Sequence, residues 1–236
     1  MDKYSINARL YPMAILLLPI VILGITYSIE MESYLNVLSS IGISAALSYF
    51  LAQIGRDNGQ RKEKGLWEFW GGAPVEQLFS FQNCEIDEQT KKRYHKKMET
   101  VVPLENEIDF SSATTEETKG IYQSWTKYLI TNTRDTKKYS LVFKELISYG
   151  FRRNLWGLKS FSIFLILACM TANFGYNFFV NKSFNPLDYS LGFQVSEITL
   201  LCVLLVWIFI INRAWAKIPA FAYAERLLET IDNLID

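Results

Sequence analysis

The sequence predicts an all-α membrane protein in which four transmembrane helices, arranged as two pairs, flank one mainly helical cytoplasmic domain. Two observations carry this prediction. Half of the 236 residues are hydrophobic, although 24 Lys and Arg balance 24 Asp and Glu. The charged residues are separated from long uncharged stretches, whereas a soluble protein spreads its charges along the chain.

Four stretches are apolar enough to cross a bilayer, whose hydrocarbon core of about 30 Å requires roughly 20 apolar residues in a helix. The fourth stretch reaches that length only when it includes Glu197 in its outer part. We interpret the first as a retained helix and not as a signal peptide, because another apolar segment follows closely and no cleavage site is evident. The predicted spans are residues 10–29, 33–55, 160–181 and 191–212.

The distribution of Lys and Arg sets the predicted orientation, because these residues resist translocation and collect on the cytoplasmic side. One side of the spans carries nearly all of the cations, and the other carries only Lys182. Both termini and the large central domain are therefore expected inside the cell. The predicted regions are the cytoplasmic N-terminus 1–9, the spans in 10–55, the cytoplasmic domain 56–159, the spans in 160–212 and an amphipathic cytoplasmic tail 213–236.

Helices are also predicted throughout the cytoplasmic domain. The first, residues 61–70, should end at Gly71 and Gly72, because two glycines followed by Pro74 cannot continue a helix at low cost. The Thr-x-Glu-Glu pattern at residues 114–117 is typical of a helix start. We expect the first and last helices of the domain to continue directly from the second and third spans. Further helices are predicted from residue 75, at 87–100 as a charged exposed helix, at 115–129 and at 139–151.

The tail after the fourth span has the pattern of an amphipathic helix. Its apolar residues recur at steps of three or four and alternate with acids. This pattern leaves two alternatives, a helix that docks on its own cytoplasmic domain or a coiled-coil seam between subunits. The apolar positions are Ile218, Phe221, Leu228, Ile231 and Ile235.

No recognisable catalytic motif occurs in the sequence. The single histidine, His95, lies within a run of cations and is a poor metal ligand there. Two of the three cysteines lie within predicted spans and Cys84 stands alone, so no metal set or disulfide framework is expected. Phosphate-binding and dinucleotide-binding glycine patterns are also missing. We therefore predict a protein that is not an enzyme and that holds no metal and no cofactor.

Polar residues within the spans are candidates for a conduction path or for helix packing. Small residues recur every four positions in the second span, which lets helices approach closely but also suits a wet pore wall. Glu197 would repeat as a ring of carboxylates in a symmetric assembly, or it would simply reach water at the end of its span. The pore or packing candidates are Asn36, Ser40, Ser44, Ser48, Asn173, Asn177 and Glu197.

Cations beside aromatic residues in the cytoplasmic domain suggest a second kind of site. Cations bind phosphates and aromatic rings stack on bases, so the combination suits a nucleotide or a short single strand. The alternative is that these cations form a solvated face and anchor the spans on the inner side. The ligand-binding candidates are Lys91, Lys92, Arg93, Lys96, Lys97, Arg134, Lys137, Lys138, Tyr139, Arg152 and Arg153.

Three segments resemble a known group of proteins. Residues 149–159, read as Tyr-Gly-Phe-Arg-Arg-Asn-Leu-Trp-Gly-Leu-Lys, together with Thr133-Arg134-Asp135 and Trp70-Gly-Gly-Ala-Pro74, are similar to bacterial membrane effectors of anti-phage defence, in particular the Hailong type. The layout of two spans, a cytoplasmic domain and two spans is similar too. The resemblance implies a homo-oligomeric channel in the bacterial inner membrane that binds an oligonucleotide made by a cognate nucleotidyltransferase.

The leading functional hypothesis is thus an oligomeric, ligand-gated ion channel or membrane-permeabilising effector, with the lipid bilayer as its surroundings and a tetramer as the expected assembly. A nucleotide or short DNA oligomer on the cytoplasmic domain would gate it. The alternative is a membrane scaffold or sensor subunit that docks a soluble partner and conducts nothing. A transporter is a third hypothesis, for which Pro12 and Pro19 in one span are the only hints.

Overall fold

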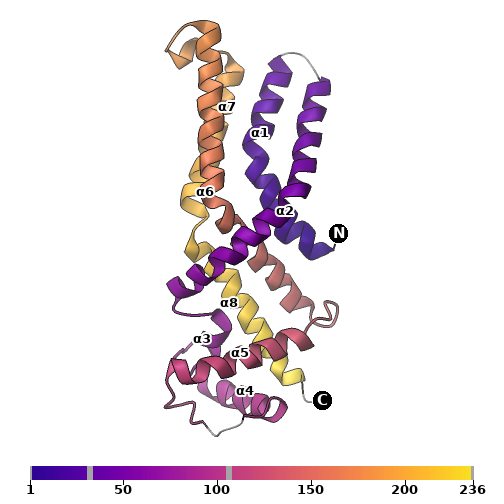
Figure 1. The fold of residues 1–236 in the computed structure, drawn as a ribbon, viewed down its shortest axis with the longest axis vertical. Coiled ribbons are helices and arrows are strands. Elements are labelled where there is room, and N and C mark those ends of the chain that lie inside the picture. Colours follow the sequence, from indigo (N-terminus) through magenta and orange to yellow (C-terminus); the bar gives the residue numbers. More distant parts are fainter. Residues whose placement is uncertain (1, 31–33, 105–107, 235–236) are drawn as a thin grey trace. The chain divides into compact units, whose positions relative to one another are not determined.

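The computed structural model describes residues 2–30, 34–104 and 108–234. These residues form helices and no strands, which confirms the all-α prediction. The chain divides into two compact units (Figure 1). The bundle unit contains residues 1–62 and 150–215, and the central unit contains residues 63–149 and 216–236.

The bundle unit contains the apolar helices. Three helical stretches are long and apolar enough to cross a membrane, namely Ser5–Ile29, Ser140–Asn181 and Leu191–Ile210. The remaining predicted span is residues 33–55. Its described part, residues 34–55, falls in α2, and several side chains there lie outside the described part of the chain. In order, the unit comprises η1 (Ser5–Leu10), α1 (Tyr11–Glu30), the first part of α2 (Tyr34–Trp70), the later part of α6 (Ser140–Asn181), η2 (Pro186–Asp188), α7 (Leu191–Leu205) and η3 (Val206–Ile210).

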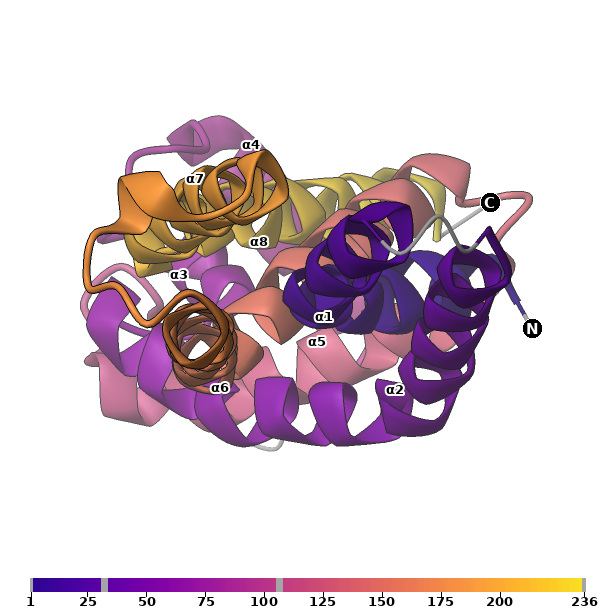
Figure 2. The ribbon, with the colours of Figure 1, turned by 90° about the horizontal axis from the view of Figure 1, so that it is seen from above.

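Apolar side chains occupy both the interior and the outer surface of the bundle unit. Leu16, Ile166 and Leu200 are buried in its core, where α1 packs along α7. Phe164 and Phe209, in contrast, are each 68% exposed. Exposure of so large an apolar surface to water is unfavourable, whereas contact of the same surface with lipid is not. The surface of this unit therefore suits an apolar surrounding. Figure 2 shows the chain from above, with the apolar part of α6 end-on.

Helices α2 and α6 cross in close contact within the bundle unit. A Cβ atom added to Gly157 of α6 would lie 2.7 Å from the Cα atom of Gly59 in α2. Beside the crossing, the Lys62 ammonium donates to the Gly157 carbonyl oxygen at 2.9 Å. The buried amide of Asn154 donates to the carbonyl oxygen of Ala8 at 2.6 Å. The missing side chains of the two glycines thus allow the backbones to meet.

Replacing Gly157 by leucine is expected to lower the free energy of unfolding of the detergent-solubilised protein by at least about 1–3 kcal/mol, because overpacking a tight contact forces the helices apart. Gly175 provides a matched control on the same helix, since a Cβ atom added there meets nothing within 4 Å. Thermal unfolding followed by circular dichroism compares the two variants. Equal losses for Gly157→Leu and Gly175→Leu would contradict the crossing.

The central unit contains several shorter helices. α2 ends at Trp70, and Gly71 and Gly72 follow with positive φ angles of 90° and 137°, which confirms the predicted stop. Thr114 and Glu117 form a capping box at the start of α5, as predicted, and α2 and α6 are each one continuous helix. The unit comprises the end of α2, α3 (Pro74–Phe79), α4 (Glu88–Val101), α5 (Thr115–Asn132), the start of α6, nearly all of α8 (Arg213–Glu229) and η4 (Thr230–Asn233).

The C-terminal tail packs into the core of the central unit. Leu227 and Ile231 are fully buried in the same cluster as Trp125 of α5. The tail therefore docks on its own chain, which is the first of the two predicted alternatives. Ile218 takes no part, because its side chain is 64% exposed, and Ile235 lies outside the described residues.

The prediction that α4 is an exposed helix is wrong for one of its faces. Lys91 is only 2% exposed, and its ammonium donates to the carbonyl oxygen of Ser80 at 2.7 Å and to that of Asn83. Burial lowers the pKa of Lys91. His95, one turn further on, is buried as well. The run of charges in the sequence concealed this inward face, because lysine can bury its chain wherever its ammonium finds acceptors.

Replacing Lys91 by methionine is expected to lower the free energy of unfolding by about 2 kcal/mol, because two buried carbonyl oxygens lose their donor. Lys92→Met is the matched control. The neighbouring Lys92 is exposed and pairs only with the exposed Glu88 at 2.5 Å, a contact that contributes at most about 1 kcal/mol. Denaturant titration measures both variants, and a larger loss for Lys92→Met would contradict the role of Lys91.

Candidate functional site

A network of polar side chains lies among the apolar helices of the bundle unit. The Tyr27 hydroxyl of α1 donates to the Asn173 side-chain oxygen of α6 at 2.5 Å. The Asn173 amide donates to a carboxylate oxygen of Glu197 in α7 at 2.7 Å and to the Ser196 hydroxyl at 3.2 Å. The Asn177 amide donates to the Tyr27 hydroxyl at 3.0 Å. Three helices thus meet at one set of five side chains, the Glu197 network.

The hydrogen bonds of the Glu197 network share one direction. Asn177 donates to Tyr27, Tyr27 donates to Asn173, and Asn173 donates to Glu197. Glu197 therefore acts as an acceptor at the end of the chain. A carboxylate can only accept hydrogen bonds, so this arrangement is complementary to its ionised form. Glu197 is thus an acidic side chain that an amide donor holds among apolar helices.

Local sequence explains why these side chains meet. Asn173 and Asn177 are four residues apart and therefore lie on one face of α6, where both are buried. At about 1.5 Å per residue, Asn173 lies roughly 20 Å along the helix from Lys159. Tyr27 stands in the last turns of α1, and Glu197 stands in the second turn of α7.

Sequence reasoning identified three members of the network and missed two. Asn173, Asn177 and Glu197 were predicted as separate polar positions, and the structure brings them together. Tyr27 and Ser196 were missed. Their signal was the same as that of the others, a polar group within an apolar stretch, but nothing in one sequence indicates which of these groups are partners.

The small residues that recur every four positions in α2 face the interior of the bundle unit. Ser44, Ser48 and Ala52 are buried at steps of four residues, whereas Ile43 and Leu47, each one position before a buried serine, are exposed. The Ser48 hydroxyl donates to the Ser44 carbonyl oxygen of its own helix at 2.8 Å. This arrangement is typical of helix packing. The side chains of Asn36 and Ser40, the other two pore or packing candidates of α2, lie outside the described residues.

The predicted ligand-binding cations of α4 do not form a single site. The Arg93 guanidinium and the Lys97 ammonium both pair with the Asp232 carboxylate, at 3.1 Å and 3.2 Å. Lys91 is buried and occupied by carbonyl oxygens, and Lys92 pairs with Glu88. Most of these cations therefore hold the central unit together. Lys96 is exposed and lines a hollow that also contains Lys92.

The remaining candidates lie elsewhere along the chain. Arg134, Lys137 and Lys138 are exposed in the turn before α6, where Lys138 stands over the half-buried ring of Tyr139 at 5.3 Å. Arg152 and Arg153 belong to the bundle unit. The Arg152 guanidinium donates to the Trp215 carbonyl oxygen at 2.9 Å and lies 4.7 Å from the centre of the Trp215 indole ring. The Arg153 side chain is buried and donates to the Asn154 side-chain oxygen at 3.4 Å.

His95 stands in an aromatic cluster of the central unit. Its ring centre is 4.5 Å from that of Phe110 and 4.9 Å from that of Phe81. Its Nε2 atom lies 3.0 Å from the Phe79 carbonyl oxygen, whereas its Nδ1 atom has no hydrogen-bond partner. Burial lowers the pKa of His95 to about 4. The ring is therefore neutral at pH 7.

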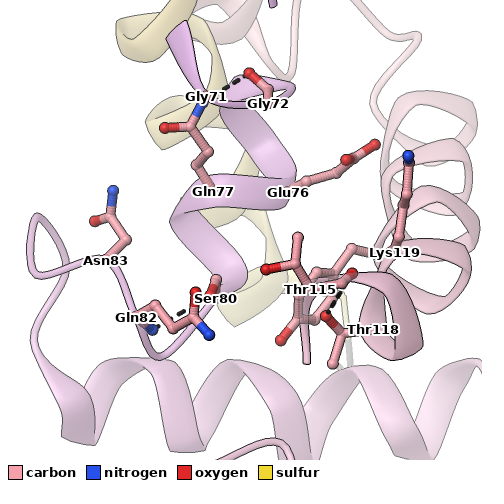
Figure 3. A pocket seen from close by; sticks show the side chains of 11 residues that line it. Gly71, Gly72, Glu76, Gln77, Ser80, Gln82, Asn83, Thr115, Thr118 and Lys119 are labelled. Atoms are coloured by element: carbon pink, nitrogen blue, oxygen red, sulfur yellow. Dashed lines mark hydrogen bonds between the residues drawn. The ribbon is translucent and has the colours of Figure 1, made fainter. Parts of the chain in front are cut away.

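A second hollow of the central unit is polar (Figure 3). It has a volume of about 230 Å³ and lies between α3 and the first turns of α5. Among its lining residues, the Gln77 amide donates to the Gly72 carbonyl oxygen at 2.6 Å. Glu76 accepts from the Gln123 amide at 3.1 Å, and Lys119 brings one positive charge to the same wall. Charges of both signs and mutually bonded polar groups give this pocket no preference for an anion.

Within the described ranges, no group of three or more His, Cys, Asp and Glu side chains could hold a metal ion. Comparisons with protein-family models, with curated proteins and with solved structures gave no match to this chain.

Proposed function

We propose that this chain is a multi-pass protein of a bacterial inner membrane that assembles into a cation-conducting channel, with four copies as the expected number. The Glu197 network carries the proposal. An ionisable side chain held among membrane helices is expensive to bury and marks a functional path by default. In a symmetric assembly Glu197 would repeat as a ring of carboxylates, which attracts cations and repels anions.

The proposed topology has four spans, with α2 supplying the second, and places both termini and the central unit in the cytoplasm. The cations support this orientation, because Arg152 and Lys159 lie on α6 before its apolar part, and Asn173 lies far along it. The Lys159 ammonium donates to the carbonyl oxygens of Ile208 and Ile211 at 2.8 Å and 2.7 Å. The Glu197 network would then lie near the outer mouth.

A ligand on the central unit would control opening in this proposal. Because α2 and α6 are each continuous between the two units, a change in the central unit can bias the packing of the spans. The ligand would shift the closed-to-open equilibrium by its difference in affinity for the two states. The resemblance to Hailong-type effectors supports a nucleotide or short DNA oligomer as the ligand, and a nucleotidyltransferase as the partner that makes it.

Reconstitution tests the proposal. Purified protein is placed in liposomes that contain a potassium-sensitive dye, and flux is recorded with and without short DNA oligomers. We expect potassium flux that exceeds chloride flux and that changes when the oligomer is added to the face carrying the central unit. Protein-free liposomes and liposomes with heat-denatured protein serve as controls.

Two results would contradict the proposal in different ways. Flux that ignores every oligomer would remove the gating part and leave the channel. No flux under any condition would favour the non-conducting scaffold, and a reporter fused after Asp109 that proves to be extracellular would overturn the topology.

A further inference from the structure

The connection between α6 and α7, at one end of the bundle unit (Figure 1), turns its apolar side chains outward. It carries the three most exposed large apolar side chains of the described residues. Phe184 is 78% exposed, Leu187 is 77% exposed, and Leu191 at the start of α7 is 75% exposed. Single apolar residues are common on protein surfaces, but three so close together indicate a contact surface.

The polar groups of the same connection bond to one another. The Asp188 carboxylate accepts hydrogen bonds from the Ser183 hydroxyl at 2.6 Å and from the Asn185 amide at 3.0 Å. The Asn185 side-chain oxygen accepts from the Leu187 N–H at 3.2 Å, and Pro186 has no N–H to satisfy. Water would solvate these groups without such pairing, whereas a loop that meets lipid must satisfy them internally.

Tyr189 fixes the connection to the two helices. Its ring is buried, and the ring centre lies 4.8 Å from that of Phe193 in α7 and 5.9 Å from that of Phe174 in α6. The Tyr189 hydroxyl donates to the Ser183 carbonyl oxygen at 2.6 Å. The outward direction of the apolar side chains is therefore a fixed feature of the connection.

The apolar surface continues from the connection onto both helices. Phe179 and Val180 of α6 and Val195 and Ile198 of α7 are exposed, and both helices contain stretches that are long and apolar enough to cross a membrane. The exposed Lys182 stands at the end of α6, where a lysine can extend its ammonium to lipid headgroups while its chain stays in apolar surroundings. A lipid cover on the connection would thus be continuous with the one that suits these helices.

We propose that residues 184–191 form a lipid anchor, which lies in one leaflet of the bilayer at the boundary between headgroups and acyl chains. Phe184, Leu187 and Leu191 would contact acyl chains, while the polar groups of the connection stay bonded to one another. Irregular loops do not occur in the hydrocarbon centre, but aromatic and apolar side chains are common at its boundary. The proposed topology makes this leaflet the outer one, whereas the insertion itself depends on neither orientation nor conduction.

The anchor also determines the depth of the Glu197 network. Glu197 follows Leu191 by six positions in α7, which corresponds to about 9 Å along the helix. With Leu191 among acyl chains, the Glu197 carboxylate lies below the headgroups and reaches water only through a hydrated path inside the protein. Insertion of the anchor therefore excludes the alternative in which Glu197 simply ends in water at the end of its span.

Spin labelling of the full chain in phospholipid vesicles tests the proposal. The three native cysteines, Cys84, Cys169 and Cys202, are replaced by alanine, and a nitroxide is attached to a single new cysteine. Electron paramagnetic resonance then measures its collisions with oxygen, which concentrates in lipid, and with a nickel chelate, which stays in water. The labelled variants are Leu187→Cys and Phe184→Cys in the anchor, Phe164→Cys as the lipid reference on α6 and Thr136→Cys as the water reference in an exposed turn of the central unit.

Nickel collisions at residue 187 should be at least about tenfold rarer than at residue 136, because a transfer cost of about 1.4 kcal/mol excludes a polar solute from lipid by that factor. Oxygen collisions should approach those at residue 164. The label at residue 184 repeats the measurement, so one perturbed variant does not decide the result.

Two results would overturn the lipid anchor. Nickel collisions as frequent as at residue 136 would place the connection in water, and low collision rates with both reagents would show that protein covers it. The measurement needs no ion flux. Lipid contact in a protein that conducts nothing would sustain the anchor and refute the proposed channel, whereas conduction with both anchor labels in water would do the reverse.

Discussion

Replacing Glu197 by glutamine is expected to reduce potassium flux through reconstituted liposomes at least tenfold and to abolish the preference for potassium over chloride. Glutamine keeps an acceptor oxygen for the Asn173 amide, which now lies 2.7 Å from the carboxylate, but it carries no charge. A unit charge attracts a cation 4 Å away by about 4 kcal/mol at an effective dielectric constant of 20. Loss of even a third of that attraction corresponds to a factor of ten.

Thr199→Val is the control for this experiment. Thr199 is exposed on the same helix, and its hydroxyl donates only within α7, to the Val195 carbonyl oxygen at 2.7 Å. Its flux should equal that of the unmodified protein. If Glu197→Gln conducts as well as Thr199→Val and keeps its selectivity, the Glu197 network serves helix packing alone.

The elements of the fold that depend on neighbouring residues were predictable from the sequence. The stop of α2 follows from Gly71 and Gly72, and the start of α5 follows from the reciprocal bonds of Thr114 and Glu117. These features act within one or two turns of the chain. Length and composition likewise predicted the apolar stretches, because a bilayer requires a fixed number of apolar residues.

Features that depend on distant partners were not predictable from one sequence. Lys91 looked like one more exposed cation, yet its ammonium is held by two carbonyl oxygens, those of Ser80 and Asn83, in a turn eight to eleven residues away. Arg93 looked free to bind phosphate and instead pairs with Asp232, 139 residues further along the chain. Lysine and arginine have the same periodicity whether they meet a carbonyl oxygen, a carboxylate or water, so the pattern cannot distinguish these cases.

The same limit applies to the candidate sites. Polar positions within the spans could be identified one by one, but the pairing of Asn177 with Tyr27 joins residues 150 positions apart. The sequence placed His95 among cations, which are its neighbours along the chain. Its neighbours in the structure are aromatic rings from three other segments, and burial among them lowers the pKa of the imidazole.

Lowering the pH from 7 to 5 is expected to reduce the free energy of unfolding of the central unit by about 2 kcal/mol through His95. Burial lowers the pKa of this imidazole from 6.5 to about 4, so between these values the unfolded chain binds a proton that the folded chain does not. Stability is therefore complete above pH 6.5 and falls as the pH decreases toward 4. Each pH unit in that range corresponds to about 1.4 kcal/mol.

Denaturant titrations at pH 7 and pH 5, followed by near-ultraviolet circular dichroism, measure this loss. Hydrogen bonds, first that from the Thr90 amide N–H, lower the pKa of Asp87, so this carboxylate stays ionised at both pH values and adds little to the difference. His95→Phe should be less stable at pH 7, because it leaves the Phe79 carbonyl oxygen without its donor, but its stability should not change between the two pH values. An equal loss in both proteins would show that the imidazole takes up its proton over the same pH range in the folded and the unfolded chain, so that burial does not keep the ring neutral at pH 5.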